Sequence, residues 1–565
     1  MTPRMWVLLA VLLTGHVSVD GPRLPADRQT ASEDSVAAML RDVSRSGVLT
    51  ELRWPRFPYY RDELTGLYSG TEWRPVWSKD GRPTSVARAA IDVLESAEER
   101  GLHPADYDAV LLDKRFRELS DAGSASARAI GWFDLALSIG VLRHVSDVHI
   151  GRVNPKNASV GINIERKKLD LAKVLREAID RGRIAEMVHD AEPRFVQYRN
   201  LKAAYVRYRA LAADSTVPTV PATRAVHRGE HFDGMQALRR RLTALGDLPA
   251  DASAPGAADA TLYDDATAQA VARFQERHGL TVDSVLGPGT LAAVNVSPAK
   301  RLRQIELALE RIRWLPALDT GPFVVVNVPS FELYAFDTLG TDGVPTLTMN
   351  VVVGRADVGR RTPLFERDMQ YLYFRPYWVI PPGILRRETL PAVRRDAGYL
   401  TRNEMELYSG SGDTGPTVPS TAANIARVSR GELGIRRRPG PRNDLGLAKF
   451  IFPNDHNVYM HGTPATALFS RARRDFSHGC IRLEDPPKLA VWVLRDPTKW
   501  SAEQVREAMD GTRTFRVDLP RPLPVVIYYT TTVVKPDGVV AFYDDVYRHD
   551  ARLEEILAKG YPFAP

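Results

Sequence analysis

Two short segments late in this 565-residue chain carry residue types that could do covalent chemistry. Cys480 is the sole cysteine, so its thiol cannot form a disulfide within the chain. Gly479 precedes it directly, Arg482 follows two residues later, and His461 and His478 lie nearby in the sequence. Neighbouring positive charge favours a thiolate, and a positioned histidine can take the thiol proton. These residues predict a nucleophilic thiol whose pKa is lowered by its surroundings.

A role follows for each neighbour of the thiol. His461 is the predicted general base, because a strand ending there and a turn ending at Cys480 can lie side by side. Gly479 lets a substrate approach the backbone closely, and N–H groups near Cys480 are predicted to stabilise a tetrahedral oxyanion. Arg482 is predicted to hold the thiolate or to bind a substrate carboxylate. Tyr459 lies two residues before His461, so a strand places both side chains on one face.

The elements that must position these residues are predicted to be β-strands. Strand-like runs begin at residue 323, and two more, at 450–452 and 457–460, lead directly to His461. Residues 384–437 interrupt this β pattern with polar, helix-like pieces and are predicted to be an inserted cap over the site. The sequence therefore predicts a mostly β catalytic domain over 301–520, followed by a β-rich extension over 521–565.

The remainder of the chain is predicted to be helical. Residues 35–215 show mainly helical apolar spacing and are predicted to form a scaffold domain without legible chemistry. Residues 227–296 form a compact unit, hereafter the small domain, whose first helix spans 235–245 with Met235, Leu238, Leu242 and Leu245 on one face. The predicted fold class is multidomain α+β.

The charge of the chain indicates its expected partners, and the N-terminal residues indicate its expected compartment. The formal charge of +7 and the pI of about 9.3 weakly indicate an anionic partner. No compact Lys/Arg run with interleaved aromatic residues stands out, so nucleic acid is not an expected partner. Residues 6–13 are an unbroken apolar run after Arg4, which predicts a signal peptide over 1–19 and export. An uncleaved N-terminal membrane anchor is the alternative to cleavage.

Three motifs resemble known families. The segments 461–464 (HGTP) and 477–483 (SHGCIRL) resemble the signature of the YkuD-type L,D-transpeptidase catalytic domain. The segments 438–446 and 449–454 resemble its large periplasmic branch, which also carries a scaffold and a peptidoglycan-binding domain. The pattern over 263–291 resembles the small three-helix peptidoglycan-binding domain. It departs from that pattern at Ser284, where a glycine is usual after the aspartate.

The resemblance implies a reaction and further site residues. Cys480 would attack a peptidoglycan tetrapeptide stem, release D-alanine and pass the acyl group to the amine of a second stem as a 3→3 cross-link. Carbapenems would acylate the same thiol, no cofactor or metal is implied, and the location would be the periplasm. The Gly462 carbonyl would orient the base. His478 is expected to shape the loop, and Asn443 to contact the substrate.

Four other interpretations stay open at this point. His461, His478 and Cys480 are permissible zinc ligands, so a zinc hydrolase is conceivable, although the chain has no H-E-x-x-H motif. Residues 297–300 match S-x-x-K of serine acyltransferases but lack the companion K-T-G. Water instead of an amine could accept the acyl group, giving an L,D-carboxypeptidase. The chain could also be a non-catalytic wall-binding protein.

Overall fold

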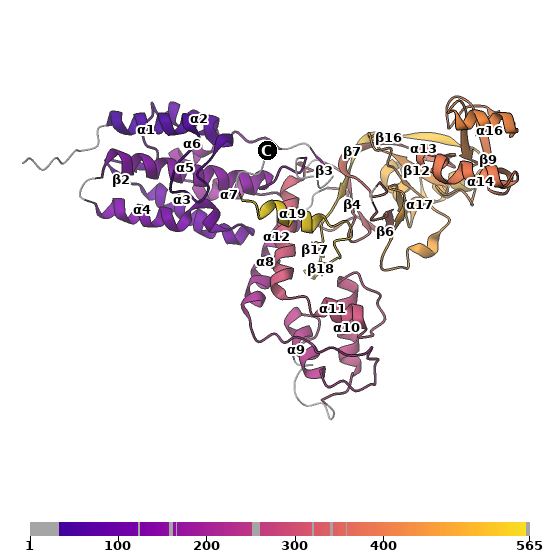
Figure 1. Ribbon diagram of the computed structural model, residues 1–565, viewed down its shortest axis with the longest axis horizontal. Helices are drawn as coiled ribbons and strands as arrows, with labels where there is room; N and C mark the ends of the chain where they lie inside the picture. The colour runs from indigo at the N-terminus through magenta and orange to yellow at the C-terminus, as the bar shows by residue number, and fades with distance from the viewer. Residues whose placement is uncertain are drawn as a thin grey trace, which may run out of the picture.

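The structure is a computed structural model that describes residues 33–122, 125–156, 162–164, 167–250, 260–318, 321–338, 343–357 and 359–560. The predicted signal peptide over 1–19 lies outside the described residues. Figure 1 shows a helical bundle at one end, a β-rich part at the other, and a small helical domain that projects from between them. The predicted multidomain α+β fold class is confirmed.

The N-terminal bundle is built around one long buried helix. α5 (Ala127–Ile150) begins at Ser126, whose side chain accepts a hydrogen bond from the Ala129 N–H, and its residues 130–148 are buried. Its buried Asp134 accepts hydrogen bonds from the Tyr68 hydroxyl and two backbone N–H groups. The surrounding helices are α1 (Glu33–Ser46), α2 (Arg61–Ser69), α3 (Ser85–Glu95), α4 (Ala109–Asp121), α6 (Leu171–Arg181) and α7 (Ile184–Ala191).

Two long helices connect the N-terminal bundle, the small domain and the β-rich part (Figure 1). α8 (Val196–Ala213) and α12 (Pro298–Trp314) pack against each other and frame the small domain, which contains α9 (Met235–Leu245), α10 (Asp265–Arg277) and α11 (Pro288–Val294). The predicted helix over 235–245 coincides with α9. Ser284 adopts a left-handed φ of 59°, and its N–H donates to the Gln275 side chain at 2.9 Å. Gln275 thus holds the turn in which a glycine is usual.

The β-rich part is a sheet that closes on itself. Its order is β12-β13-β15-β6-β5-β4-β16-β7, and β12 also pairs with β7, which completes the ring. The strands are β4 (Phe323–Asn327), β5 (Glu332–Phe336), β6 (Leu347–Gly354), β7 (Leu364–Phe374), β12 (Ala448–Ile451), β13 (Met460–His461), β15 (Ile481–Leu483) and β16 (Phe515–Tyr528). β3 (Ile162–Asn163), which follows α5 in the chain, extends the sheet by pairing with β7. β14 (Asp475–Ser477) pairs with β6.

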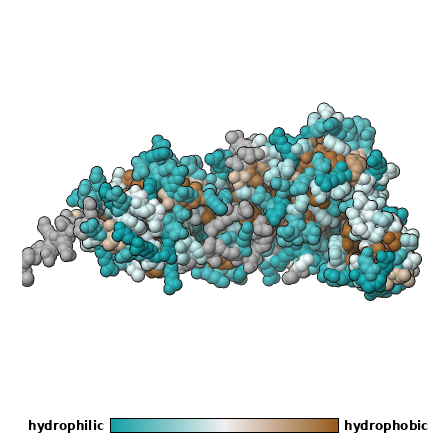
Figure 2. All heavy atoms as spheres, turned by 90° about the horizontal axis from the view of Figure 1, so that it is seen from above, coloured by the Kyte–Doolittle hydropathy of each residue, from teal (hydrophilic) through white to brown (hydrophobic). Residues whose placement is uncertain are grey.

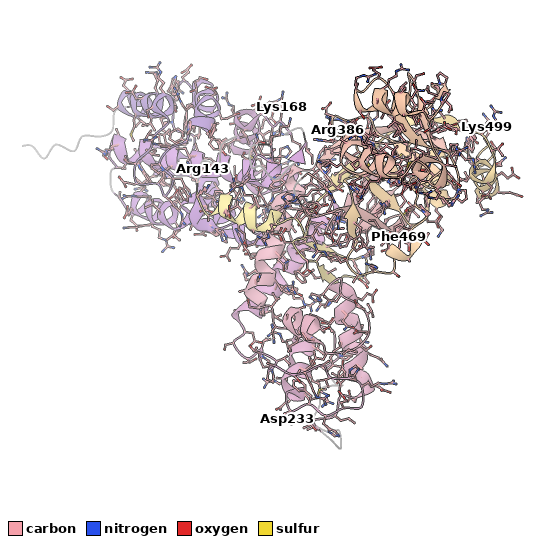
Figure 3. The ribbon with its side chains drawn as sticks, turned by 45° about the vertical axis from the view of Figure 1, so that its right-hand side comes forward. Arg143, Lys168, Asp233, Arg386, Phe469 and Lys499 are labelled. Carbon is pink, nitrogen blue, oxygen red and sulfur yellow. The ribbon has the colours of Figure 1, made fainter. Side chains whose placement is uncertain are left out.

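The cap is inserted between β7 and β12 and has its own hydrophobic cluster. The predicted helical pieces are present as α13 (Pro382–Ile384), the π-helical turn η5 (Leu385–Thr389), α14 (Leu390–Arg395), α15 (Tyr399–Arg402) and α16 (Ala422–Ser429). A small sheet, not predicted from the sequence, joins β8 (Trp378–Val379), β9 (Met405–Tyr408), β10 (Thr417–Val418) and β11 (Gly434–Arg437). Figure 3 shows Arg386 in the cap and Asp233 near the tip of the small domain, on separate arms of the molecule.

The end of the chain differs in organisation from the predicted extension. Residue 521, where that extension starts in the sequence prediction, lies inside β16, which pairs with both β4 and β7. Pro520, Pro522 and Pro524 resemble a linker, but Pro520 and Pro522 fall at a register shift within a continuous strand, and Pro524 pairs with Asp368 after it. The predicted turn at 536–538 joins the hairpin β17 (Thr532–Val534) and β18 (Val540–Phe542). The last element that the structure describes is a helix, α19 (His549–Leu557).

The face of the molecule seen from above (Figure 2) is mostly hydrophilic. Figure 2 shows hydrophilic side chains over most of one face, with scattered hydrophobic patches. Among the helices that the structure describes, none combines the length and the apolar character that a membrane span requires. α17 (Pro486–Leu494), the helix predicted after residue 483, and α18 (Ala502–Asp510) follow β15 and lead to β16.

Candidate active site

The predicted base and nucleophile lie at neighbouring strands. β13 runs parallel to β15, with Met460 opposite Ile481, and the Ile481 N–H donates to the Tyr459 carbonyl at 3.1 Å. Side chains alternate along a strand, so Tyr459 and His461 share one face with Cys480. The rings of Tyr459 and His461 have centroids 5.7 Å apart. Residues separated by about twenty positions in the sequence are thus brought to one face of the sheet.

His461 is held as a neutral imidazole. Its side chain is buried, and its Nδ1 donates a hydrogen bond to the Gly462 carbonyl at 2.5 Å. Burial lowers the pKa of His461 to about 3, and the positive charges of Arg482 and Lys449 act in the same direction. A proton on Nδ1 leaves Nε2 as a lone-pair acceptor. The ring is therefore in the protonation state that a general base requires at neutral pH.

The thiol of Cys480 lies among cationic and aromatic neighbours. Cys480 is partly exposed, and its Sγ lies 3.9 Å from the Asn457 carbonyl oxygen. Burial raises the pKa of the thiol, while hydrogen bonding with Tyr459 and the charge of Lys449 act to lower it. The prediction of a lowered thiol pKa is therefore wrong in its net direction, because the desolvation of the sulfur outweighs the nearby positive charge.

Lys449 is a site residue that the sequence analysis missed. It lies opposite His461 across the β12–β13 pair, and its Nζ lies 4.4 Å from the centroid of the Tyr459 ring. Burial lowers the pKa of Lys449, while the charges of Asp413 and Cys480 raise it. The strand-like run recognised in the sequence began at residue 450, one position after Lys449. The sequence could not indicate that the Lys449 side chain faces the thiol.

The turn before Cys480 is fixed by hydroxyl groups. Gly479 has a φ of 122°, which L side chains rarely adopt. The Gly479 carbonyl accepts a hydrogen bond from Thr362 Oγ1 at 2.8 Å, and the Gly479 N–H donates to Ser477 Oγ at 3.1 Å. Ser477 Oγ in turn donates to the Cys480 carbonyl at 2.5 Å. The Gly479 N–H is engaged within the turn, so the structure favours Gly479 as an orienting residue over a direct oxyanion donor.

His478 connects the catalytic turn to the cap. Its Nε2 lies 3.2 Å from Oε1 of Glu388, which belongs to η5 of the cap. Both side chains are substantially exposed. The role of His478 in shaping the loop stays a prediction. The contact with Glu388 gives the cap a direct connection to the turn that carries the thiol.

Arg482 and Asn443 differ in their access to the site. Arg482 lies across from His461 in the β13–β15 register, and its Nε is buried without a hydrogen-bond partner among the described residues. Burial lowers its pKa, while the charges of Asp444 and Cys480 raise it.

Asn443 is wholly buried, and its amide donates to the carbonyls of Pro376 and Arg438. The structure thus gives Asn443 a loop-holding position, and its predicted contact with substrate would require this loop to open.

No metal-binding geometry accompanies these residues. Within the ranges that the structure describes, no three His, Cys, Asp or Glu side chains gather closely enough to hold a metal ion. His478, one of the three ligands that a zinc site would need, instead contacts Glu388 of the cap.

Comparisons with known proteins agree with this arrangement. Residues 62–204 match the model of a family described as "Scaffold domain", residues 233–294 that of a "Putative peptidoglycan binding domain", and residues 321–527 that of the YkuD "L,D-transpeptidase catalytic domain". A protein of Haemophilus influenzae named "Putative L,D-transpeptidase" is 26% identical over 251 residues, which cover 44% of this chain. The match spans about half of that relative, 49% of its length. The chain thus carries a catalytic domain of the YkuD L,D-transpeptidase family together with a scaffold domain and a peptidoglycan-binding domain.

Proposed function

We propose that this protein is a cysteine-dependent L,D-transpeptidase that forms 3→3 cross-links in peptidoglycan in the cell envelope. The observation that carries the proposal is the position of a neutral His461, held by the Gly462 carbonyl, on the same face of the sheet as Cys480, which directly precedes the neighbouring strand β15. A thiol with a raised pKa needs a base that removes its proton during attack, and a neutral imidazole can supply it. The peptidoglycan-binding domain supports peptidoglycan as the substrate.

The first half-reaction forms a thioester. His461 takes the proton of the Cys480 thiol while Sγ attacks the carbonyl carbon of the L-centre in a donor tetrapeptide stem. The carbonyl oxygen becomes an oxyanion, for which the positive charges of Arg482 and Lys449 are the nearby stabilising groups. The tetrahedral intermediate collapses, the C–N bond to terminal D-alanine breaks, and the protonated His461 returns its proton to the leaving amine.

The second half-reaction transfers the acyl group. The side-chain amine of a second stem attacks the thioester carbon and loses a proton to His461. The C–S bond breaks, and the thiolate of Cys480 takes the proton back from His461. The product is an amide between two stems, and the free thiol is restored. Water in place of the amine would give a trimmed stem, which is the carboxypeptidase alternative.

The test is mass spectrometry of the full chain after incubation with purified disaccharide-tetrapeptide. We expect an acyl adduct on Cys480 with loss of D-alanine, and cross-linked dimers as the main product. Cys480→Ala should abolish the adduct, and His461→Gln should slow acylation by about 10²–10⁴-fold, the usual contribution of general base catalysis. Carbapenems should form an adduct at the same residue.

The outcomes separate the alternatives. Tripeptides without dimers would identify an L,D-carboxypeptidase. Activity that survives thiol alkylation but is lost with a chelator would support a zinc hydrolase. Wild-type turnover in Cys480→Ala would overturn the cysteine mechanism. Wall binding without any turnover by the intact chain would support a non-catalytic wall-binding protein.

A further inference from the structure

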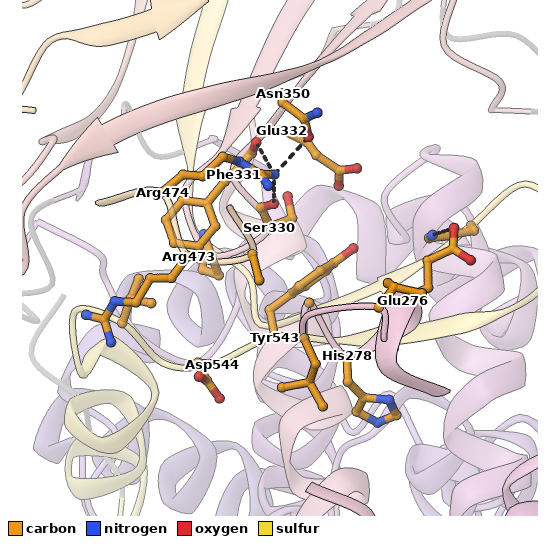
Figure 4. A pocket seen from close by; sticks show the side chains of 17 residues that line it. Glu276, His278, Ser330, Phe331, Glu332, Asn350, Arg473, Arg474, Tyr543 and Asp544 are labelled. Carbon is orange, nitrogen blue, oxygen red and sulfur yellow. Dashed lines mark hydrogen bonds and ion pairs between the residues drawn. The ribbon is translucent and has the colours of Figure 1, made fainter. Parts of the chain in front are cut away.

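A second cavity lies where the small domain, the closed sheet and the C-terminal hairpin meet. It has a volume of about 230 Å³. The small domain contributes the end of α10 and the following turn, including Glu276 and Val282. The sheet side contributes Arg473 and Arg474, and the C-terminal segment contributes Lys535, Tyr543 and Asp544. Figure 4 shows Glu276, Arg473, Arg474 and Asp544 around the cavity, with Tyr543 between them.

The wall formed by the sheet is held in place by internal hydrogen bonds. Arg474 donates to the Phe331 carbonyl at 3.1 Å and to Asn350 Oδ1 at 2.8 Å. Burial lowers the pKa of Arg474, while the charge of Glu332 raises it. Arg473 pairs with both carboxylate oxygens of Asp475. The cavity therefore has a preformed charged wall and does not depend on a ligand to assemble it.

The opposite side of the cavity carries charged side chains that are not held by short hydrogen bonds. Lys535 Nζ lies 3.8 Å from Glu276 Oε1, beyond hydrogen-bond distance; Lys535 is partly exposed and Glu276 is exposed. Asp544 is also exposed, and its charge raises the pKa of Arg473 across the cavity. Charges of both signs thus face one small space, where a ligand that carries an ammonium group and carboxylates can satisfy them.

The cavity wall is connected to the catalytic turn through the chain. Arg473 and Arg474 precede β14, and Ser477 at the end of β14 holds the turn of Gly479 and Cys480 through its hydroxyl. Burial raises the pKa of Tyr543 in the cavity, next to the charge of Glu332, so its phenol stays neutral. A ligand held here would lie between the small domain and the strand that leads to the thiol.

We propose that this cavity is a second binding site for peptidoglycan, which takes a stem peptide through its charged groups. The inference rests on the proposed function for its choice of ligand. The site lies on the contact between the small domain and the catalytic domain, so both domains contribute to it. A stem held there would keep the polymer close to the catalytic turn while a neighbouring stem reacts.

The test uses the full chain with Cys480 alkylated by iodoacetamide, so that the reactive site is blocked. Calorimetric titration with the free stem tetrapeptide should show binding to this alkylated chain. Lys535→Gln should weaken the affinity at least fivefold, because it removes a cation from the cavity. Val282→Trp should do the same by filling it; Val282 is 57% exposed, so the larger side chain does not disturb a core.

Matched controls are available elsewhere on the surface. Lys499→Gln removes an exposed lysine from the catalytic domain, and Val110→Trp enlarges an exposed valine of the scaffold. Figure 3 places Lys499 at the far edge of the molecule. Both controls should bind the tetrapeptide within twofold of the parent chain. The disaccharide without peptide should bind more weakly than the tetrapeptide.

Three results would overturn the inference: no binding to the alkylated chain, equal affinity in the cavity variants and their controls, or tighter binding of the disaccharide than of the tetrapeptide. Failure of the proposed function is recognised separately, as the absence of an acyl adduct on Cys480 in the unmodified chain. The cavity variants should still form that adduct with the soluble disaccharide-tetrapeptide.

Discussion

At the scale of single residues, the site combines a histidine, His461, whose pKa is lowered with a thiol, that of Cys480, whose pKa is raised. The hydrogen bond from His461 Nδ1 to the Gly462 carbonyl orients the ring, and burial keeps it neutral. Lys449 and Arg482 place positive charge beside the sulfur, where it partly offsets the desolvation of a thiolate. Under the proposed mechanism, the thiol stays protonated at rest and becomes a nucleophile when its proton moves to the imidazole.

The contribution of Lys449 can be measured through the reactivity of the thiol. Lys449→Met removes a positive charge that lowers the thiol pKa, so the pKa should rise further. The rate of alkylation by iodoacetamide at neutral pH should fall several-fold, and its pH profile should move to higher pH. Lys499→Met, at an exposed position, should leave the profile unchanged. An unshifted profile in Lys449→Met would show that the lysine does not act on the sulfur.

At the scale of secondary-structure elements, the cap and the catalytic turn meet through one polar contact. η5 of the cap presents Glu388 to His478, two residues before the nucleophile. The charge of Asp413, on the loop between β9 and β10, also acts on Lys449 and on Tyr459. The cap therefore contacts the catalytic turn, and one of its charges acts on side chains of the site. We propose that the cap also limits which acceptor reaches the acyl group on Cys480.

Breaking the contact between cap and turn should change the choice of acceptor. Glu388→Gln weakens an exposed pair worth about 0–1 kcal/mol, so the melting temperature should hardly move. A looser cap admits water, so the ratio of trimmed to cross-linked product should rise a few-fold, as measured by chromatography of the products. Glu432→Gln alters a cap glutamate that pairs with Arg427 and Arg430, and serves as the control. Equal product ratios in the two variants would rule out a role for the contact.

The helix α5 contains a second buried histidine, with consequences for acid stability. Burial lowers the pKa of His144 to about 3, with the charges of Arg100 and Arg313 acting in the same direction. Because the folded-state pKa lies below the unfolded value near 6.5, the unfolded chain binds more protons. Stability is therefore lost as the pH falls from about 6.5 towards 3, by up to about 1.4 kcal/mol per pH unit.

His144→Phe should reduce this acid sensitivity. Hydrogen exchange of the α5 amides at pH 7 and pH 5 should show a smaller loss of protection in the variant than in the parent. Phenylalanine keeps an aromatic ring beside Tyr107, whose centroid lies 4.8 Å from that of His144. His103→Gln changes an exposed histidine of the same domain and should retain the parental pH dependence. An unchanged slope in His144→Phe would contradict the assignment.

At the scale of the whole molecule, α12 holds the parts together. Its Glu310 accepts a hydrogen bond from the Val153 N–H at 2.9 Å, and its buried Arg311 pairs with Asp550 of α19. The small domain is attached through the C-terminal hairpin, where Arg277 donates to the Val540 carbonyl at 3.0 Å. The Phe542 ring lies 5.2 Å from that of Tyr208 and 5.8 Å from that of His278. These contacts place the polymer-binding part at a defined position relative to the catalytic part.

Removing the aromatic anchor should release the small domain. Phe542→Ala deletes a wholly buried ring, which typically costs about 3–5 kcal/mol, part of it from this contact between domains. Small-angle scattering should then show a broader distribution of distances. Phe133→Ala, in the scaffold core, should lower stability while the small domain keeps its position. Identical scattering from the Phe542→Ala variant and the parent would argue against the hairpin as an anchor.

The sequence by itself determined the class of chemistry, because that depends on residue types at short spacing. The histidine, glycine and cysteine of segments 461–464 and 477–483 indicated a cysteine-dependent transferase domain, and helical periodicity indicated α9 and the helical scaffold. The sequence also predicted the hairpin turn at 536–538 and the interruption of the β pattern by the cap. Both predictions were possible because turn residues and a change in hydrophobic period are local signals.

Only the tertiary structure decided how distant segments act on one another. Lys449 belongs to the site because β12 pairs with β13, and Thr362 positions Gly479 from more than a hundred residues away. The raised pKa of the Cys480 thiol, the burial of Asn443 and the continuation of β16 past residue 521 likewise depend on packing that no local pattern encodes. Desolvation and strand pairing are properties of the assembled sheet, so the sequence could name the nucleophile but not the environment that controls it.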